Sequence, residues 1–147
     1  MKRLLVIAAS VLASVLLASC STYQDNAPSW LPGSGAVSVK LSGTEEVPPV
    51  SATGSGSGTI RVNADGTVSG SVTTTGVEGT MAHIHQAAKG QNGPIIIPLT
   101  KSGDTYTVPA GAKLNEAQMK AFKEGNLYVN VHTARNKGGE VRGQLQP

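Results

Sequence analysis

The sequence predicts an all-β sandwich or barrel with one short helix, and three observations predict this fold class. The segment Val37–Leu41 alternates apolar and polar residues, which is typical of a half-buried strand. Asp65-Gly66 separates two strand-like segments, residues 57–63 and 67–75, and favours a tight hairpin turn. Further short strands are expected between turn residues, at 80–86, 94–100, 104–108, 126–133 and 140–146.

One segment near the C-terminal end carries helix signals instead. Asn115 can cap a helix, and Gln118 stands at the third position after it, as in a capping box. Gly125 provides a helix stop. Met119 and Phe122 lie three residues apart, so they would share one face. We therefore expect a short helix that covers an edge of the β core.

The first residues predict export and lipidation. Lys2 and Arg3 precede the apolar run 4–17, which is too short for a confident membrane span. The run ends in Leu17-Ala18-Ser19-Cys20, which resembles the lipobox of bacterial lipoproteins. That resemblance implies a lipoprotein signal peptide over residues 1–19 and a lipid on Cys20. The alternative is an ordinary secretory signal that contains a cysteine by chance.

The same resemblance predicts where the protein is held. A lipid on Cys20 would anchor it in the bacterial cell envelope, and the non-acidic Ser21 predicts transfer to the outer membrane. Residues 20–35 would be the lipidated cysteine and a flexible tether, and residues 36–147 one domain. Cys20 is the only cysteine. Its lipidation would leave no thiol for a disulfide or a metal site.

Charge makes a nucleic-acid partner unexpected. Removal of the signal peptide takes away two of the 12 basic residues and leaves 10 against 9 acidic residues, a net charge of +1. Nucleic-acid binding would require a clustered basic face with aromatic residues, which the sequence lacks. The expected partners are the membrane, through the lipid, and an envelope protein.

All three histidines fall in two predicted strands. His83 and His85 alternate with Ile84 and therefore share one face, and His132 lies opposite the apolar face of residues 126–133. Two imidazoles on one strand and a third from a neighbour can form three corners of a copper or zinc site. Met81 shares their face and is a further candidate ligand. The alternative is a solvated polar face.

Candidate oxygen ligands and supporting residues lie elsewhere in the chain. Glu45 and Glu46 could offer an oxygen ligand, although the prolines that follow also fit a rigid edge loop. Matching apolar residues across the last two strands, Val131 with Val141 and Leu127 with Leu145, sets Glu140 across from His132. In this register Glu140 and Arg142 lie on the imidazole side. They could support a ligand, Glu140 by orienting His132, or simply pair with each other.

Four motifs stand in order along the chain: LSGTEEVPPV (41–50), AHIH (82–85) with GQNGP (90–94), GNLYVNVHT (125–133) and GEVRGQL (139–145). Together they resemble the CHRD domain, a module named after chordin, over about residues 36 to 146. The resemblance implies an immunoglobulin-like sandwich outside the cytoplasm. The family has no settled biochemical role.

A looser similarity connects the histidines with copper-zinc superoxide dismutase. That enzyme also carries a His-x-His strand and a later strand histidine on the outer face of a Greek-key barrel, with an arginine nearby. His83, His85, His132 and Arg142 match in type and order. The chain has no further histidines for a zinc site, no bridging histidine and no second cysteine for a disulfide. The similarity therefore leaves superoxide turnover in doubt.

Two functions follow from these observations. One is an envelope lipoprotein that binds copper, or alternatively zinc, through three histidines. Such binding should weaken as pH falls through about 6.5, where free imidazoles take up protons. The alternative is a non-catalytic interaction or structural module without a metal. No catalytic residue is assigned, because no Gly-x-Ser-x-Gly elbow and no Ser-His-Asp set can be identified.

Overall fold

A computed structural model describes residues 34–147, and the predicted signal peptide, Cys20 and most of the tether lie outside them. The described part is mostly antiparallel β-sheet with one α-helix, which confirms the predicted fold class. Its strands are β1 (Ser34–Ser42), β2 (Ser55–Asn63), β3 (Val68–Thr75), β4 (Gly79–Gln86), β5 (Ile95–Pro98), β6 (Thr100–Ser102), β7 (Thr105–Thr107), β8 (Leu127–Thr133) and β9 (Val141–Leu145). The helices are the short 3₁₀ turn η1 (Gly43–Glu45) and α1 (Glu116–Lys123).

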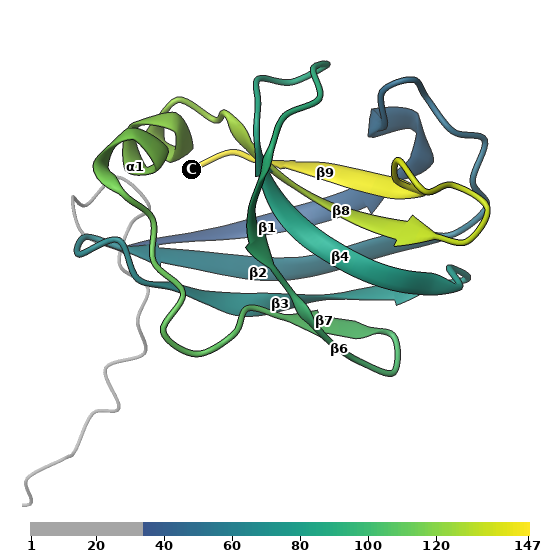
Figure 1. Cartoon of the computed structure of the whole chain (residues 1–147), viewed down its shortest axis with the longest axis horizontal. Helices are drawn as coiled ribbons and strands as arrows, with labels where there is room; N and C mark the ends of the chain where they lie inside the picture. Colours follow the sequence, from purple (N-terminus) through teal and green to yellow (C-terminus); the bar gives the residue numbers. More distant parts are fainter. Residues whose placement is uncertain (1–33) are drawn as a thin grey trace, which may run out of the picture.

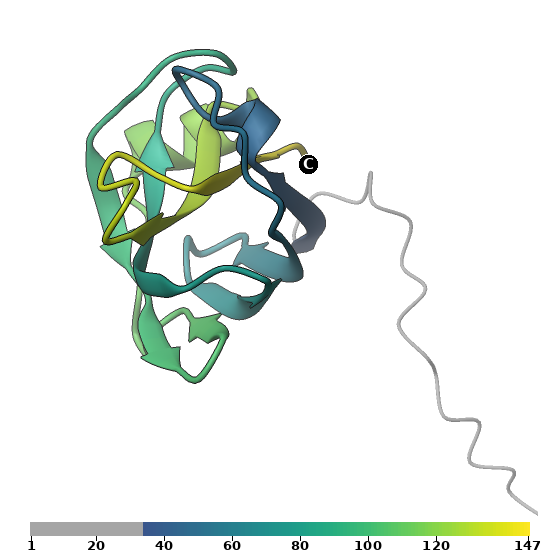
Figure 2. The same cartoon turned by 90° about the vertical axis from the view of Figure 1, so that its right-hand side faces the viewer.

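The strands form one sheet that rolls into a nearly closed barrel (Figures 1 and 2). Their order is β5-β4-β8-β9-β1-β2-β3-β7-β6. Strands β5 and β6 follow each other in sequence but stand at opposite ends of the sheet. Leu99, between them, donates its backbone N–H to Ala82 O of β4 at 2.9 Å. Strands β1 and β9 share a single ladder pair, Ser42 with Arg142. The sheet is therefore loosely joined between β5 and β6 and between β1 and β9, as in a sandwich.

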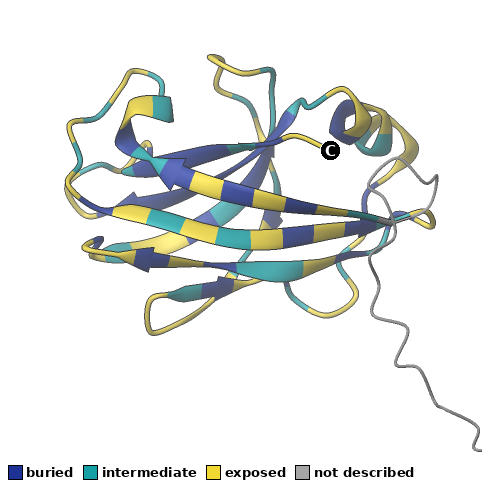
Figure 3. Ribbon diagram, turned by 180° about the vertical axis from the view of Figure 1, so that it is seen from behind, coloured by how far each residue is buried: buried dark blue, intermediate teal, exposed yellow. Residues whose placement is uncertain are grey.

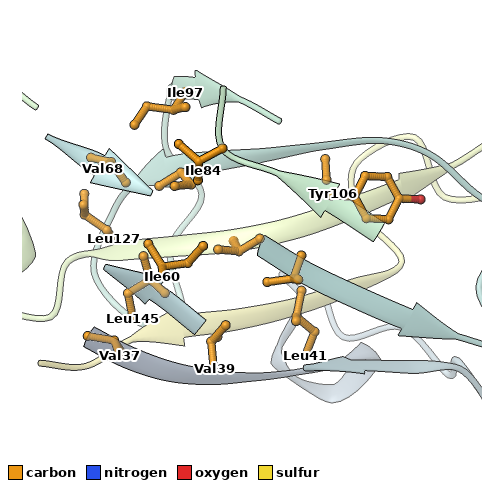
Figure 4. Packing of buried hydrophobic residues seen from close by; sticks show 14 of the residues in the cluster. Val37, Val39, Leu41, Ile60, Val68, Ile84, Ile97, Tyr106, Leu127 and Leu145 are labelled. Carbon is orange, nitrogen blue, oxygen red and sulfur yellow. The ribbon is translucent and has the colours of Figure 1, made fainter. Parts of the chain in front are cut away.

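The interior is lined by the apolar faces that sequence periodicity predicts. Burial alternates along β1 and β2, where Val37, Val39, Leu41, Ile60 and Val62 point inward (Figure 3). Residues from the other side of the barrel meet them in one cluster (Figure 4). Burying such side chains contributes roughly 1.5–3 kcal/mol each. The opposite members of this cluster include Ile84, Ile97, Leu127, Val129, Val131, Val141 and Leu145.

Local predictions agree with the structure in most places. Strands β2 and β3 form the expected hairpin, and Gly66 takes a φ of +85° in the turn. Asn115 accepts from the backbone N–H of Gln118 at 2.8 Å, and the side chain of Gln118 accepts from Asn115 N, which completes the capping box. The apolar pairs Val131–Val141 and Leu127–Leu145 lie in the predicted register.

One predicted strand is divided in two. Residues 94–100 were expected to form a single strand, but they form β5 and the start of β6, with Leu99 between them. The break has a physical cause. Strands β5 and β6 are the two edge strands of the sheet, so the chain must pass from one edge to the other between Pro98 and Thr100. None of the helices in residues 34–147 combines the length and hydropathy that crossing a membrane requires.

Candidate metal centre

Strands β4 and β8 bring the three histidines together on the outer face of the barrel. The two strands pair in antiparallel register, with His83 opposite Asn130 and His85 opposite Tyr128. His132 therefore lies diagonally across from His83, and the nitrogens His83 Nδ1 and His132 Nε2 are 2.9 Å apart. One ligand atom from each of the three rings lies within 4.8 Å of the others.

Two of the rings are oriented by backbone carbonyls. His85 Nδ1 lies 2.9 Å from Gly93 O, and His132 Nδ1 lies 2.8 Å from Lys137 O. A carbonyl oxygen can only accept, so both Nδ1 atoms donate and both Nε2 atoms are unprotonated. His132 Nε2 then accepts from His83 Nδ1, and an ion bound between them would require the His83 proton to move to its Nε2 atom. His85 Nε2 is buried and has no hydrogen-bond partner. A backbone carbonyl behind an imidazole is the usual support of a metal-binding histidine.

The surroundings favour the neutral form of His83 and His85. Burial, together with the neighbouring His132 and His85, lowers the pKa of His83 from 6.5 to about 4. Burial is also the main cause that lowers the pKa of His85, while Gly93 O acts in the opposite direction. Neutral imidazole is the form that coordinates metals. His83 and His85 are therefore ready to bind a metal at neutral pH.

The spacing fits a single ion after small movements. Zinc–nitrogen bonds of about 2.0–2.1 Å place two ligands of a tetrahedral ion roughly 3.4 Å apart. The His83 and His132 nitrogens would separate by a few tenths of an ångström from 2.9 Å, and His85 would approach them. The described residues offer no Asp or Glu to this group. Three nitrogens thus leave a fourth position open.

A stack of planar groups, Tyr128 and Arg142, packs against the ring face of His85. The rings of His85 and Tyr128 are stacked, with centroids 4.8 Å apart and an interplanar angle of 8°. The guanidinium carbon of Arg142 lies 3.4 Å from the Tyr128 ring centroid. Arg142 is only 1% exposed, and among the described residues no carboxylate lies within ion-pair distance of it. The cation is stabilised by the aromatic face and by neutral acceptors.

One of these acceptors is Gln144 Oε1 in β9, at 3.3 Å, and the other two belong to the loop 87–93, which covers the stack. Arg142 donates to Ala88 O at 3.5 Å and to Asn92 Oδ1 at 3.4 Å. The backbone N–H of Gly93 donates to Tyr128 Oη at 3.2 Å, and Gln144 Nε2 donates to Ala87 O at 3.0 Å. The loop that carries the His85 partner Gly93 is therefore fixed to β8 and β9. The imidazole face is a covered polar layer, and all seven residues of β8 are buried.

A second loop places an acid in the same layer. Glu46 is 4% exposed, and its Oε1 atom has no hydrogen-bond partner. A Cβ atom on Gly139 would lie 2.2 Å from this oxygen and 2.7 Å from Asn130 Nδ2, so only glycine fits there. Burial raises the pKa of Glu46 to about 7, against the opposing effect of Arg142. This carboxyl lies beside Asn130 and Gly139.

The other candidate residues occupy different places. Glu140 precedes β9, and its Oε2 accepts from Thr133 Oγ1 at 2.9 Å and from Asn136 Nδ2. The partner of His132 Nδ1 is instead Lys137 O. Glu45 forms an exposed ion pair with Lys89, at 3.1 Å. Met81 stands opposite His132 and is exposed.

Sequence reasoning missed the two carbonyls and the stacked tyrosine. Gly93 and Lys137 act through backbone atoms, which leave no mark in residue type. Tyr128 alternates with Val129 and therefore shares the face of Asn130 and His132, and this position was the available signal. Its contact with His85 depends on the neighbouring strand, which that alternation does not identify.

We expect the substitution Glu46→Gln to raise the free energy of unfolding above pH 7 and to change it little at low pH. The folded pKa of about 7 exceeds the unperturbed 4.5, so the folded protein binds more protons between these values. The stability from this group is complete below pH 4.5 and is lost as pH rises through 7. Glutamine resembles the protonated acid at every pH. Thermal unfolding across this range would show the difference.

Glu78→Gln provides the control for this experiment, because Glu78 is exposed. Its effect on the free energy of unfolding should be small. A Glu46→Gln effect of equal size at both ends of the range would contradict a raised pKa for this carboxyl.

Comparison with known proteins identifies the domain. The family model described as the CHRD domain matches residues 37–145, which include every strand from β2 to β9 and all three histidines. Neither the curated proteins nor the solved structures contained a match to this chain. The family match covers more than half of the chain and agrees with the four motifs. The chain therefore belongs to the CHRD domain family.

Proposed function

We propose that this domain binds one transition-metal ion, copper or alternatively zinc, through His83 Nδ1, His85 Nε2 and His132 Nε2. The observation that carries the proposal is the tautomer of His85 and His132, which two backbone carbonyls determine. Their Nδ1 atoms donate to the carbonyls of Gly93 and Lys137, which leaves unprotonated Nε2 atoms that converge with His83. One of these atoms is buried without a partner, which is costly unless a ligand satisfies it.

Ligand chemistry favours copper over zinc. Divalent copper binds a given set of nitrogen ligands more tightly than the other first-row ions. Structural zinc sites usually add thiolates, and lipidated Cys20 would leave none. A site with three imidazoles and an open position suits storage, transfer or protection against metal stress. None of these roles requires a catalytic residue.

The domain would carry out this role at the envelope. The basic, apolar and small-residue parts of residues 1–19 stand in the order of a lipoprotein signal peptide, directly before Cys20. The lipid would hold the protein on the membrane, and Ser21 favours the outer membrane as its destination. Residues from Ser21 to the start of β1 would serve as the tether.

A second function has one observation in its favour. Ile95, in β5 at the end of the sheet, is 52% exposed, and Met81 is the other large apolar side chain of residues 34–147 that is exposed. An interaction module could use this surface to bind an envelope protein. The two functions differ in their response to substitution of the histidines. An interaction module would retain its partner in a pull-down after all three were replaced by alanine.

Replacing His132 by alanine should reduce copper and zinc affinity by roughly a hundredfold. Loss of a residue that only supports a ligand already costs about 10–100-fold, and loss of a ligand should cost no less. Isothermal titration of the purified protein with each ion would measure the change. The matched control is Lys137→Ala, which removes an exposed side chain but retains the carbonyl that holds His132. Equal uptake by wild type and His132→Ala would exclude the proposed site.

The pH dependence of metal affinity should differ from that of metal binding by free imidazole. The pKa of His83 is lowered to about 4 and that of His85 is lowered as well, so these rings compete less for protons than the sequence alone suggested. Metal affinity should therefore fall less steeply between about pH 7 and pH 5 than it does for free imidazole, whose pKa is about 6.5. Competition with a chromophoric chelator at each pH would measure it. A fall as steep as that of imidazole would contradict the lowered values.

Substitution of Cys20 by serine should abolish attachment of the lipid. Without the sulfur, no lipid can be attached and the signal peptide should remain uncleaved. Labelling cells with a radioactive fatty acid and comparing the mass of the protein with that of wild type would test both results. A Cys20→Ser variant that still carries label would exclude lipidation at this residue.

A further inference from the structure

Met81 is exposed beside the histidines although it has no place in the hydrophobic core. Its exposed fraction is 52%, and only Ile95 among the large apolar residues of 34–147 is as open. It is absent from the core cluster, whereas the other methionine of these residues, Met119, packs against that cluster. Methionine usually fills gaps in cores. That explanation does not apply to Met81.

The register of β4 and β8 places Met81 next to two of the three ligands. Met81 lies two residues before His83, so both side chains project from the same face, roughly 7 Å apart along the strand. Met81 also stands directly opposite His132. Opposite residues of an antiparallel pair have Cβ atoms about 4.5–5.5 Å apart. A long, flexible thioether at this position can reach the space between the rings.

We propose that Met81 is the fourth ligand of this site and that the site binds the cuprous ion. The proposal rests on the three-histidine function above and identifies the ion that the site is built for. Thioether sulfur is a soft ligand that selects Cu(I), whereas zinc takes thiolate, imidazole or carboxylate. With Met81 Sδ in place, three nitrogens and one sulfur complete a four-coordinate site.

No acidic side chain competes for the fourth position. Glu140 is bound to Thr133 and Asn136, and the carboxyl of Glu46 lies against Asn130 and Gly139. The three-histidine group includes no Asp or Glu of the described residues. A carboxylate ligand, which would favour Zn²⁺ or Cu²⁺, is therefore not provided by the described residues.

The exposure of Met81 also indicates how the ion would enter and leave. His85 and His132 are buried, and His83 is partly buried, so the imidazole side of the site faces the protein. The thioether is the ligand on the solvent side. A weak neutral ligand at that place would be the first to exchange with an incoming donor. The site would then pass Cu(I) to or from a soluble carrier by exchange at sulfur.

The test compares Met81→Leu with wild type in affinity for two ions. Leucine keeps the size and apolar character of the side chain but removes the sulfur. We expect Cu(I) affinity to fall roughly tenfold in anaerobic competition with a chromophoric cuprous chelator, and Zn²⁺ affinity to remain within about twofold. Met119→Leu is the matched control, and it should change neither affinity. X-ray absorption of the Cu(I) protein should show a copper–sulfur contact that Met81→Leu lacks.

Two results separate this inference from the function on which it rests. Unchanged Cu(I) affinity in Met81→Leu, with His132→Ala impaired, would overturn the role of Met81 and leave the three-histidine site intact. A wild-type protein that binds neither ion would overturn both proposals. If Cu²⁺ affinity is unaffected, a tenfold selective loss of Cu(I) also lowers the Cu(II)/Cu(I) potential by about 59 mV, which voltammetry would detect.

Discussion

The antiparallel pairing of β4 with β8 is the constraint on which the candidate site depends. The pairs His83–Asn130 and His85–Tyr128 put all three imidazoles on the outer face, while Ile84 and Val129 meet in the core. A slip of one residue in either strand would send its histidines inward and its apolar residues outward. The buried apolar face therefore enforces the geometry of the polar face. One register of β4 with β8 thus determines both the packing of the core and the positions of the histidines.

The polar face is organised by backbone carbonyls in loops. Gly93 and Lys137 lie in different connections, one after β4 and one before β9, and each accepts from one imidazole. The first of these loops is held by the Arg142–Tyr128 stack, which also covers the His85 ring. Rotation of either ring would break a buried hydrogen bond, at a cost of roughly 1–3 kcal/mol. The rings are therefore oriented before any ligand binds.

This arrangement lowers the stability of the fold, because several buried polar atoms have no hydrogen-bond partner. His85 Nε2, Glu46 Oε1 and Asn130 Oδ1 are buried without partners, and Arg142 is buried without a carboxylate nearby in the described residues. Such groups gather where binding matters more than stability. A cation among the histidines would satisfy His85 Nε2 directly. Three of the four unsatisfied buried atoms of the described residues lie in this layer, and the fourth, Tyr106 Oη, belongs to a residue of the core cluster.

The sequence by itself determined the features that follow local rules. Strand alternation, the Asp65-Gly66 turn, the Asn115 capping box and the register of β8 with β9 depend on residues close together or on matching apolar faces. These signals are periodic and can be recognised without coordinates. They also placed His83 and His85 on one face.

The tertiary structure alone decided which strand lies beside β4 and what covers the histidines. The adjacency of β4 and β8 joins segments more than forty residues apart, and no local pattern encodes such a pairing. The carbonyls of Gly93 and Lys137 carry no side-chain signature, and Glu46 reaches Asn130 only because Gly139 lacks a Cβ. The break between β5 and β6 arises from barrel closure. Each of these depends on long-range contacts, which form only when the whole sheet has rolled up.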